Sequence, residues 1–463
     1  MEKWYFGGVE VFVYNIPIAE IMKKKLKKLI GINEEEFKSY IEDGEIKLRK
    51  ARLIPLIKIG DEMALTSIFL SALKYVDEYR ASFFSDIKLS KAGKAKFYTE
   101  ICFPNISKER FDGLVIIISA GRIKDAAFFE MKNKNNEIDS KQIESYMNLI
   151  KGIGVDKMIT VSNQFAPNQS QLPYQIKKSS SINNYHFSWT YLLTIAHLLL
   201  FKNETNIEDD DQVNIMKEVL AYLEHKDSGV TDFNKMKPGW KAVSEKVLSR
   251  SPLNQNDESV IEAVESWVQE EKDMGLMLSR ELGVMVKLGR DSKSYKIDTD
   301  IKKLIKSHHL QSTLKVVGSV SEISIQADFI TRTVSMSVDV DAPLDKGMKG
   351  RLGWMLRQIE KSKARYPEEF SKIENEIFID VIVKYSRSNV RHGLKVFEKF
   401  YEIDKASDIT QFKVVMIRDF GRTFESVRKF VEVLESMLLE YYMLVVQNLS
   451  NWDRPAPKLQ EKA

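Results

Sequence analysis

Cysteine is almost absent from the sequence: Cys102 is the single one among 463 residues. One cysteine excludes a disulfide framework and a cysteine-ligated metal cluster, and its scarcity fits a reducing compartment. Histidine is also rare, with six residues scattered along the chain and no zinc-ligand spacing among them. The composition therefore predicts a cytoplasmic protein without structural zinc.

Long apolar runs are lacking as well. The most apolar window, residues 191–201 (YLLTIAHLLLF), is too short to cross a bilayer. It predicts a buried helix in which His197 is a hydrogen-bonded core histidine. The first residues, MEKWYFGGVEVFVYN, are typical of a strand rather than of a basic segment before an apolar run, so we expect no signal peptide. We therefore expect no association with a membrane.

Neither sign of charge dominates, since 70 Lys and Arg face 66 Asp and Glu and leave a formal net charge of +4. Such a balance gives no global attraction to nucleic acid, so any binding surface must be local. The length and a 43% hydrophobic content suffice for two or three domains. We expect an N-terminal extension at 1–50, an α/β domain with a helical insertion at 51–250, and an α+β domain at 251–463.

Two local groups of cations could contact phosphate. The first is a lysine-rich run at residues 23–28, although such a run is more often simply a solvated helix face. The second is spread over the C-terminal half, where its members could converge on a nucleic acid or remain dispersed over the surface. Its members are Arg351, Arg357, Lys384, Arg387, Arg391, Arg418, Arg422 and Arg428.

The clearest pattern lies at residues 110–146 (RFDGLVIIISAGRIKDAAFFEMKNKNNEIDSKQIESY). Asp112 precedes an apolar strand at 114–118, and a second strand at 126–132 ends in Glu130-Met131-Lys132. The segment 119–122 (SAGR) offers the small residues that a hairpin turn needs. With the hairpin centred near Gly121, Asp112 falls opposite Glu130, while Glu130 and Lys132 share one face.

This geometry points to a cation. Directly opposed side chains lie roughly 5 Å apart at Cβ, and two carboxylates so close repel each other unless a cation lies between them. Mg²⁺ prefers oxygen ligands, and the ammonium of Lys132 could orient or activate a water or neutralise a developing phosphate charge. Alternatively, Asp-Gly is a common turn pair and Glu-x-Lys is common on a solvated strand face. Isolated charge is costly in strands as apolar as these, which favours the site.

In this stretch the chain resembles the PD-(D/E)XK nuclease superfamily. Asp112 matches its first metal-binding acid, Glu130 its second and Lys132 its lysine, although Phe111 stands where the motif name has proline. The resemblance implies a restriction-endonuclease-like mixed sheet flanked by helices. It also implies Mg²⁺ or Mn²⁺ held by the two acids and the backbone carbonyl of Met131.

Further residues could support this site. Gln142-x-x-x-Tyr146 is similar to the motif of the RecB-like branch, and its two side chains share a helix face. Asp139-x-x-Gln142 also matches the pattern of a capping box, and the two interpretations are compatible. The superfamily often carries a glutamate near the metal on the helix before the sheet. That candidate ligand is Glu62, which would fit a helix N-terminus equally well. Weaker candidates are Asp77 and Glu78 on the preceding helix and Glu100 in the strand entering the core.

The order of elements predicts a mixed sheet. An amphipathic helix at 66–79 precedes antiparallel strands at 96–103, 114–118 and 126–132, then a helix to about 151 and a buried strand at 157–162. A second crossover is suggested by a strand at 185–189 and the helix at 191–201. The acidic run at 208–211 is typical of a helix N-terminus rather than of a metal site. The segment 224–240 is expected to connect two helices.

The C-terminal half has a different pattern. A long helix is expected at 257–282, strands follow, most clearly at 333–341 and 377–385, and helices are expected at 348–361 and 423–448. This half resembles a sparsely characterised group of bacterial proteins through EEKD, LSRELG, APLDKGMKGRLGWMLRQI and YYMLVVQNLSNW. That similarity extends from about residue 51 and implies no activity.

The sequence thus favours a metal-dependent nuclease. DNA is the expected substrate, RNA is left open, and the resemblance suggests a bacterial defence or repair setting. The C-terminal half could bind a partner protein or form a homodimer. The alternative is a non-catalytic nucleic-acid-binding or interaction module on a degenerate nuclease fold.

Overall fold

The computed structural model describes residues 59–102, 109–166, 172–176, 181–201, 207–289, 296–384, 390–397 and 408–453, with strands at 2–6 and 9–13 and positions 35, 39 and 42. Contacts divide the chain into two units, Met1–Pro55 and Leu56–Ala463. In the first unit, β1 (Glu2–Phe6) and β2 (Val9–Val13) pair antiparallel. The lysine-rich run at 23–28 lies outside the described residues.

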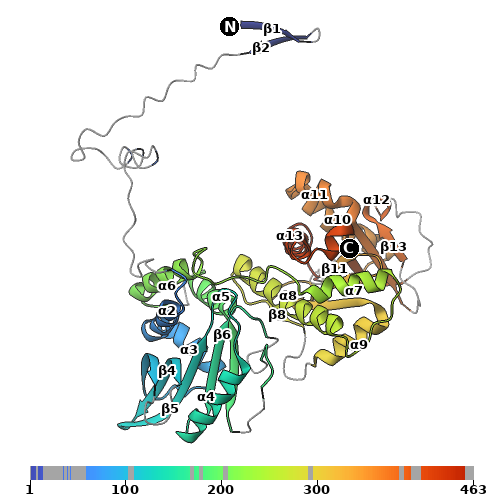
Figure 1. The fold of residues 1–463 in the computed structure, drawn as a ribbon. Helices are drawn as coiled ribbons and strands as arrows, with labels where there is room; N and C mark the ends of the chain where they lie inside the picture. The colour runs from blue at the N-terminus through green and yellow to red at the C-terminus, as the bar shows by residue number, and fades with distance from the viewer. Residues whose placement is uncertain are drawn as a thin grey trace, which may run out of the picture. The chain divides into compact units, whose positions relative to one another are not determined.

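The second unit contains two sheets, and the first is the mixed sheet expected from the sequence (Figure 1). Its strand order is β3-β4-β5-β6-β7; β3, β4 and β5 run antiparallel, whereas β5, β6 and β7 run parallel. The strands are β3 (Lys94–Cys102), β4 (Arg110–Ser119), β5 (Arg122–Met131), β6 (Lys157–Ser162) and β7 (Asn183–Ser188). A helix follows β7, as expected, but the described part of the β6–β7 connection contains no helix.

The hairpin between β4 and β5 confirms the predicted turn. Ala120 and Gly121 connect the strands, and their φ angles are 50° and 71°. Two positive φ angles characterise the type I′ turn, whose twist matches that of the flanking strands. At the end of the hairpin away from the turn, Gly113 pairs with Phe129, and continuing this register by one residue places Asp112 beside Glu130.

Helices cover both faces of this sheet (Figure 1). On one face lie α2 (Glu62–Tyr75) and α3 (Asp77–Asp86), where Phe69 and Phe83 pack on Phe129. On the other face lies α4 (Ser140–Gly152), whose Tyr146 ring is 4.3 Å from that of Phe111. Gly113 permits the close approach of α2, because a Cβ there would lie 2.9 Å from Leu70 Cδ1.

Four helices connect this sheet to the second one. They are α5 (Trp189–Leu200), α6 (Asp210–Leu223), α7 (Pro238–Leu248) and α8 (Glu258–Leu282). Asp209 caps α6 by accepting a hydrogen bond from Gln212 N at 3.0 Å, which confirms the acidic run as a helix N-terminus. His197 is hydrogen-bonded as expected, to Glu224 at 2.6 Å, but it is partly exposed rather than in the core.

The second sheet has seven strands in the order β13-β12-β14-β11-β10-β9-β8, and all its pairings are antiparallel. Its strands are β8 (Lys287–Leu288), β9 (His309–Lys315), β10 (Ile323–Asp328), β11 (Thr333–Asp341), β12 (Ile377–Val383), β13 (Val390–Gly393) and β14 (Ile409–Asp419). The remaining helices are α9 (Ile297–Ser307), α10 (Met348–Arg365), α11 (Pro367–Ile373), α12 (Leu394–Phe397) and α13 (Lys429–Leu444).

Alternate residues of β9, β10 and β11 are buried, so this sheet packs one face on the core. That core includes Trp240 and Val243 of α7. Helix α7 therefore packs with the second sheet, although it precedes the domain boundary expected at residue 250. The helix expected at 423–448 is wrong in extent: a 3₁₀ turn (Gly421–Glu425), α13 and a second 3₁₀ turn (Val446–Asn448) replace it. Among the described residues, no helix has the length and apolar character of a membrane span.

Candidate active site

The β4–β5 hairpin brings Asp112 to the end of β5. Oδ2 of Asp112 accepts a hydrogen bond from the backbone N–H of Met131 at 2.7 Å. The N–H and C=O of one strand residue point to the same side, so the Met131 carbonyl also points toward β4. The aspartate, the glutamate one residue before Met131, and this carbonyl therefore lie at one corner of the sheet.

Lys132 joins two carboxylates from distant parts of the chain. Its Nζ lies 2.8 Å from Oε1 of Glu130 and 3.1 Å from Oε1 of Glu62. Glu62 is the first residue of α2, directly after the capping residue Asp61, so the helix N-terminus favours its negative charge. The position of Glu62 at a helix N-terminus is thus confirmed. Its role as a metal ligand stays a prediction, and in the structure its carboxylate lies beside Lys132.

Glu130 is the most constrained group of the site. Its side chain is 2% exposed, and its Oε2 has no hydrogen-bond partner among the described residues. Burial, followed by the nearby charge of Asp112, raises the pKa of Glu130 from 4.5 to about 7, although Lys132 acts in the opposite direction. The carboxylate form is therefore costly here unless further positive charge approaches it.

Asp112 shows the same tendency. Burial raises its pKa above the ordinary value, and the charges of Glu62 and Glu100 add to that effect. The N–H of Met131 and the charge of Lys132 oppose it without cancelling it. The corner thus holds more negative charge than its single lysine neutralises.

Lys132 remains an ammonium ion in this environment. Burial favours its neutral form, but the charge of Glu130 and the hydrogen bonds that Lys132 donates to Glu130 and Glu62 outweigh burial and raise its pKa above the ordinary value. The side chain is 19% exposed. Two of its three N–H donors face these carboxylates, so one remains for a water or a substrate oxygen.

Gln142 and Tyr146 lie behind Asp112 and do not reach the acids directly. Gln142 Nε2 donates to the Tyr146 hydroxyl at 2.7 Å, and that hydroxyl donates to the carbonyl of Arg110 at 2.6 Å. The pair therefore holds the start of β4, two residues before Asp112. Asp139 caps α4 by accepting from Lys141 N at 2.9 Å, but the Gln142 amide is used by Tyr146, so the predicted capping box forms only in part.

Glu100 reaches the corner, whereas two weaker candidates do not. The pairs Thr99↔Gly113 and Ile101↔Phe111 place Glu100 opposite Asp112, and its φ of 56° is unusual for a residue other than glycine. Asp77 and Glu78 begin α3, at the far end of α2 from Glu62, about 18 Å along that helix.

A row of polar residues next to Glu130 was not predicted from the sequence. Glu130 pairs with Thr160 on β6, and Thr160 with His186 on β7. Thr160 Oγ1 lies 2.9 Å from both the Tyr174 hydroxyl and His186 Nδ1, and His186 Nε2 lies 2.8 Å from the Gln164 carbonyl. Burial lowers the pKa of His186 to about 4, so the ring is neutral. Only strand register brings these residues together, which explains why spacing did not reveal them.

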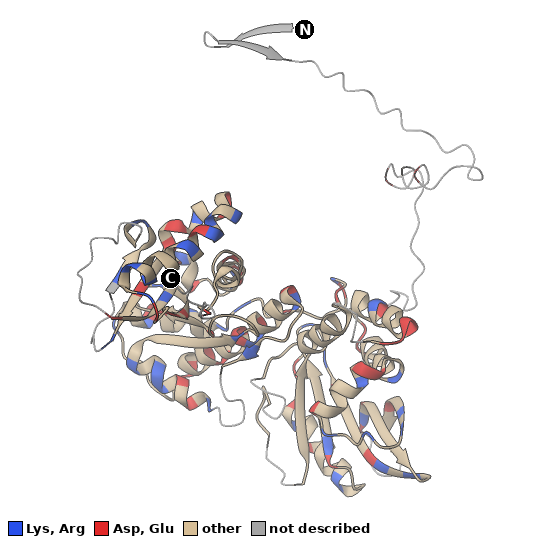
Figure 2. Ribbon diagram, turned by 180° about the vertical axis from the view of Figure 1, so that it is seen from behind, with Lys and Arg blue, Asp and Glu red and all other residues tan. Residues whose placement is uncertain are grey.

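Three of the cations of the C-terminal half, which were considered as a phosphate-binding surface, are engaged by other groups of the protein. Arg351 is buried and bonds carbonyls of Pro343 and Ile409, and Arg391 pairs with both carboxylate oxygens of Asp380. Arg418 bonds Glu376 and Glu440, while Arg387 lies outside the described residues. Charges of both signs are intermingled over this part of the chain (Figure 2).

Known protein families, curated proteins and solved structures give no match to this chain. Within the described residues, no group of three or more His, Cys, Asp or Glu side chains is arranged to hold a metal ion. The chemistry of the site must therefore be judged from its own geometry: the buried Glu130, the partly buried Asp112, a backbone carbonyl and an ammonium ion.

Proposed function

We propose that this protein is a metal-dependent nuclease whose mixed sheet is the restriction-endonuclease-like core of the PD-(D/E)XK superfamily. The observation that carries the proposal is the convergence of Asp112, Glu130 and Lys132 at the end of β5. Glu62 and the Gln142–Tyr146 pair add the supporting elements implied by the resemblance. DNA is the proposed substrate and a bacterial cytoplasm the proposed setting.

The donor set fits a hard divalent cation. Mg²⁺ is commonly held by one or two carboxylates together with waters and substrate phosphates, rather than by a cage made only of protein. Asp112, Glu130 and the Met131 carbonyl would hold it, and Glu130 Oε2 is a buried oxygen in need of a partner. This set needs no third acid, which is consistent with the absence of a three-residue metal group among the described residues.

When bound, such a cation stabilises the extra charge on a phosphate under attack and makes a bound water more acidic. Asp112 and Glu130 fix the position of that charge through a hairpin and a buried strand. Lys132 donates its remaining N–H to the attacking water or to a phosphate oxygen, because as an ammonium ion it cannot accept a proton. Glu62 holds the lysine in this orientation.

The proposal is tested by incubating the full-length protein with supercoiled plasmid, linear duplex and single-stranded DNA or RNA, with Mg²⁺ or Mn²⁺. We expect cleavage that EDTA abolishes and that Glu130→Gln reduces at least a hundredfold, since removing one electrostatic contact at such a site commonly costs that much. Nicked circles would indicate an endonuclease, and shortening from ends an exonuclease. Metal-dependent cleavage that survives in Glu130→Gln would refute the assignment.

Lys132→Ala tests the role of the lysine. We expect cleavage, measured where both proteins are folded, to fall at least a hundredfold while the circular dichroism spectrum stays that of the wild type. The melting temperature should fall, because the buried Glu130 loses its ion-pair partner. Lys151→Ala, an exposed lysine at the end of α4, is the matched control and should cleave like the wild type. Equal rates for the two variants would remove Lys132 from the mechanism.

A non-catalytic nucleic-acid-binding module is the second candidate. It is favoured by the Lys132 ammonium, which already lies between Glu130 and Glu62 and offsets part of their charge. Calorimetric titration with Mg²⁺ separates the two. Binding that disappears in Glu130→Gln supports the nuclease, and an absence of binding by the wild type supports the module.

A further inference from the structure

The outward face of β3 carries a row of exposed cations and one aromatic ring. Strand β3 forms an edge of the mixed sheet, because its only neighbour in the strand order is β4. Lys94, Lys96 and Tyr98 are all exposed, and Tyr98 retains 47% of its accessible surface. Alternate residues of a strand share a face and lie about 7 Å apart, so the three side chains form one line.

This line leads to the proposed catalytic corner. The next residue on the same face is Glu100, which lies opposite Asp112 in the β3–β4 register. Along the line, Lys96 faces Ile116 of β4 and Tyr98 faces Leu114. Both apolar side chains are partly exposed and form an apolar surface beside the cations.

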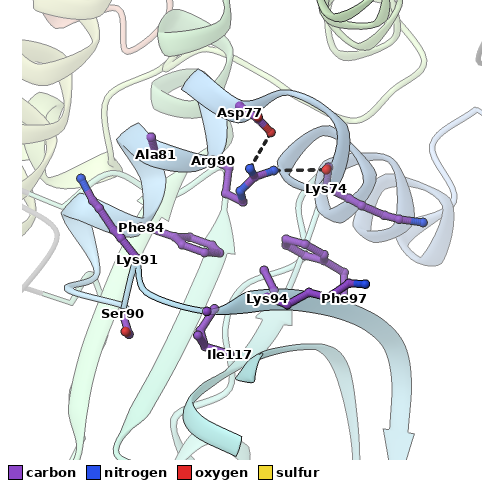
Figure 3. A pocket seen from close by; sticks show the side chains of 12 residues that line it. Lys74, Asp77, Arg80, Ala81, Phe84, Ser90, Lys91, Lys94, Phe97 and Ile117 are labelled. Carbon is purple, nitrogen blue, oxygen red and sulfur yellow. Dashed lines mark hydrogen bonds and ion pairs between the residues drawn. The ribbon is translucent and has the colours of Figure 1, made fainter. Parts of the chain in front are cut away.

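A cleft of about 530 Å³ lies against the opposite face of β3, because Phe97, which lines it, alternates with Lys96 and Tyr98 along the strand. Figure 3 shows Phe84 and Phe97 facing this cleft, with Lys74, Lys91 and Lys94 around it. The two rings are stacked, with centroids 6.4 Å apart. The cleft thus combines aromatic and cationic side chains at the end of β3 remote from Asp112.

Arg80 belongs to the cleft but is already engaged. Its Nη1 donates to the carbonyls of Leu73 and Lys74, and its Nη2 donates to Asp77 at 2.5 Å. It therefore stabilises the end of α2. The lysines are the groups left to bind a ligand anion.

We propose that the face of β3 that carries Lys94, Lys96 and Tyr98 is the track along which a single nucleic-acid strand reaches the catalytic corner. Lys94 and Lys96 bind successive phosphates, and Tyr98 stacks on a base. Aromatic stacking beside a line of cations is the usual way in which proteins hold single strands without reading their sequence. The line is one strand wide, which favours a single strand over a duplex. This inference rests on the nuclease proposal.

The test measures binding without cleavage. A fluorescein-labelled single-stranded oligonucleotide is titrated with the full-length protein in EDTA at several KCl concentrations, and anisotropy is recorded. For Lys94→Ala/Lys96→Ala we expect at least tenfold weaker binding at low salt. The slope of log Kd against log salt should fall by about 1.4, because each lost phosphate contact in a single strand removes about 0.7.

The matched control is Lys302→Ala/Lys306→Ala, which removes the same charge from exposed positions of α9. It should leave both affinity and slope unchanged. Tyr98→Ala should weaken binding at least fivefold without changing the slope, whereas Tyr98→Phe, which retains the ring, should bind like the wild type.

The results separate this inference from the nuclease proposal. The proposed track would be refuted by equal slopes for the β3 variant and the α9 control. It would also be refuted if the wild type bound no single strand, or bound a matching duplex more tightly. Loss of binding in the β3 variant supports it even if the wild type cleaves nothing with Mg²⁺ or Mn²⁺, an outcome that counts against the nuclease alone.

Discussion

At the residue scale, the buried carboxyl of Glu130 opposes folding but suits cation binding. Its raised pKa means that the folded chain binds this proton more tightly than the unfolded chain does. Its stabilising contribution is therefore complete below pH 4.5 and is lost as the pH rises toward about 7. Near neutral pH, ionisation of Glu130 therefore lowers the free energy of unfolding. The same ionisation supplies the charged oxygen that a cation would bind.

We therefore expect the unfolding free energy of the wild type, relative to Glu130→Gln, to fall between pH 4.5 and 7 and then to stay constant. The shift corresponds to about 3 kcal/mol, since each pKa unit is worth about 1.4 kcal/mol. Urea denaturation in EDTA from pH 4 to 8.5 measures this difference. Saturating Mg²⁺ should reduce the fall, because the cation favours the ionised form. Parallel curves for the two proteins in EDTA would show that Glu130 titrates normally.

At the scale of elements, alternating apolar and polar residues and local turn residues predict strands and the hairpin of the first sheet. The strands at 157–162 and 333–341 were predicted with their observed ends, and the Ala120-Gly121 turn placed Asp112 and Glu130 correctly. Contacts between sequence-distant strands were not predictable in this way. The Thr160–His186 row depends on the parallel register of β6 and β7. The helix expected at 423–448 is shorter than its apolar pattern predicts, because 3₁₀ turns flank α13 at both ends.

Helix α4 supplies the next prediction, through its bond to β4. Tyr146→Phe leaves the Arg110 carbonyl and the Gln142 amide without their partner, so we expect a loss of about 1–3 kcal/mol of stability. Cleavage should also fall, because the start of β4 no longer fixes Asp112. Urea denaturation and initial cleavage rates measure the two effects.

Tyr441→Phe provides the comparison for that variant. The Tyr441 hydroxyl donates to the Val414 carbonyl at 2.7 Å, an equivalent bond in the second sheet. This change should cost similar stability but leave the cleavage rate of the folded protein unaltered. If both variants slow cleavage equally, then the Tyr146 bond has no particular role in positioning Asp112.

At the scale of the whole molecule, α8 ties the two sheets into one unit. Arg280 of α8 donates to Thr194 of α5 at 3.1 Å, and Lys272 lies 5.7 Å from the centre of the Tyr191 ring. The same helix contributes Trp267 and Leu278 to the core of the second sheet. Residues 56–463 accordingly form a single compact unit, and a ligand that binds only the first sheet should stabilise both.

The last prediction follows from this coupling. Trp240 and Trp267 stack in the core of the second sheet, whereas the Trp189 indole donates to the Lys132 carbonyl beside the site. Trp189 is therefore replaced by Phe in both proteins, so that the fluorescence reports mainly on the second sheet. Mg²⁺ at about a hundred times its Kd adds about 2.7 kcal/mol to any unit that unfolds together with its site. We expect one thermal transition, shifted upward by Mg²⁺ in the wild type and unshifted in Glu130→Gln. Two transitions, with the tryptophan signal insensitive to Mg²⁺, would mean that α8 does not transmit stability from the corner of β5 to the second sheet.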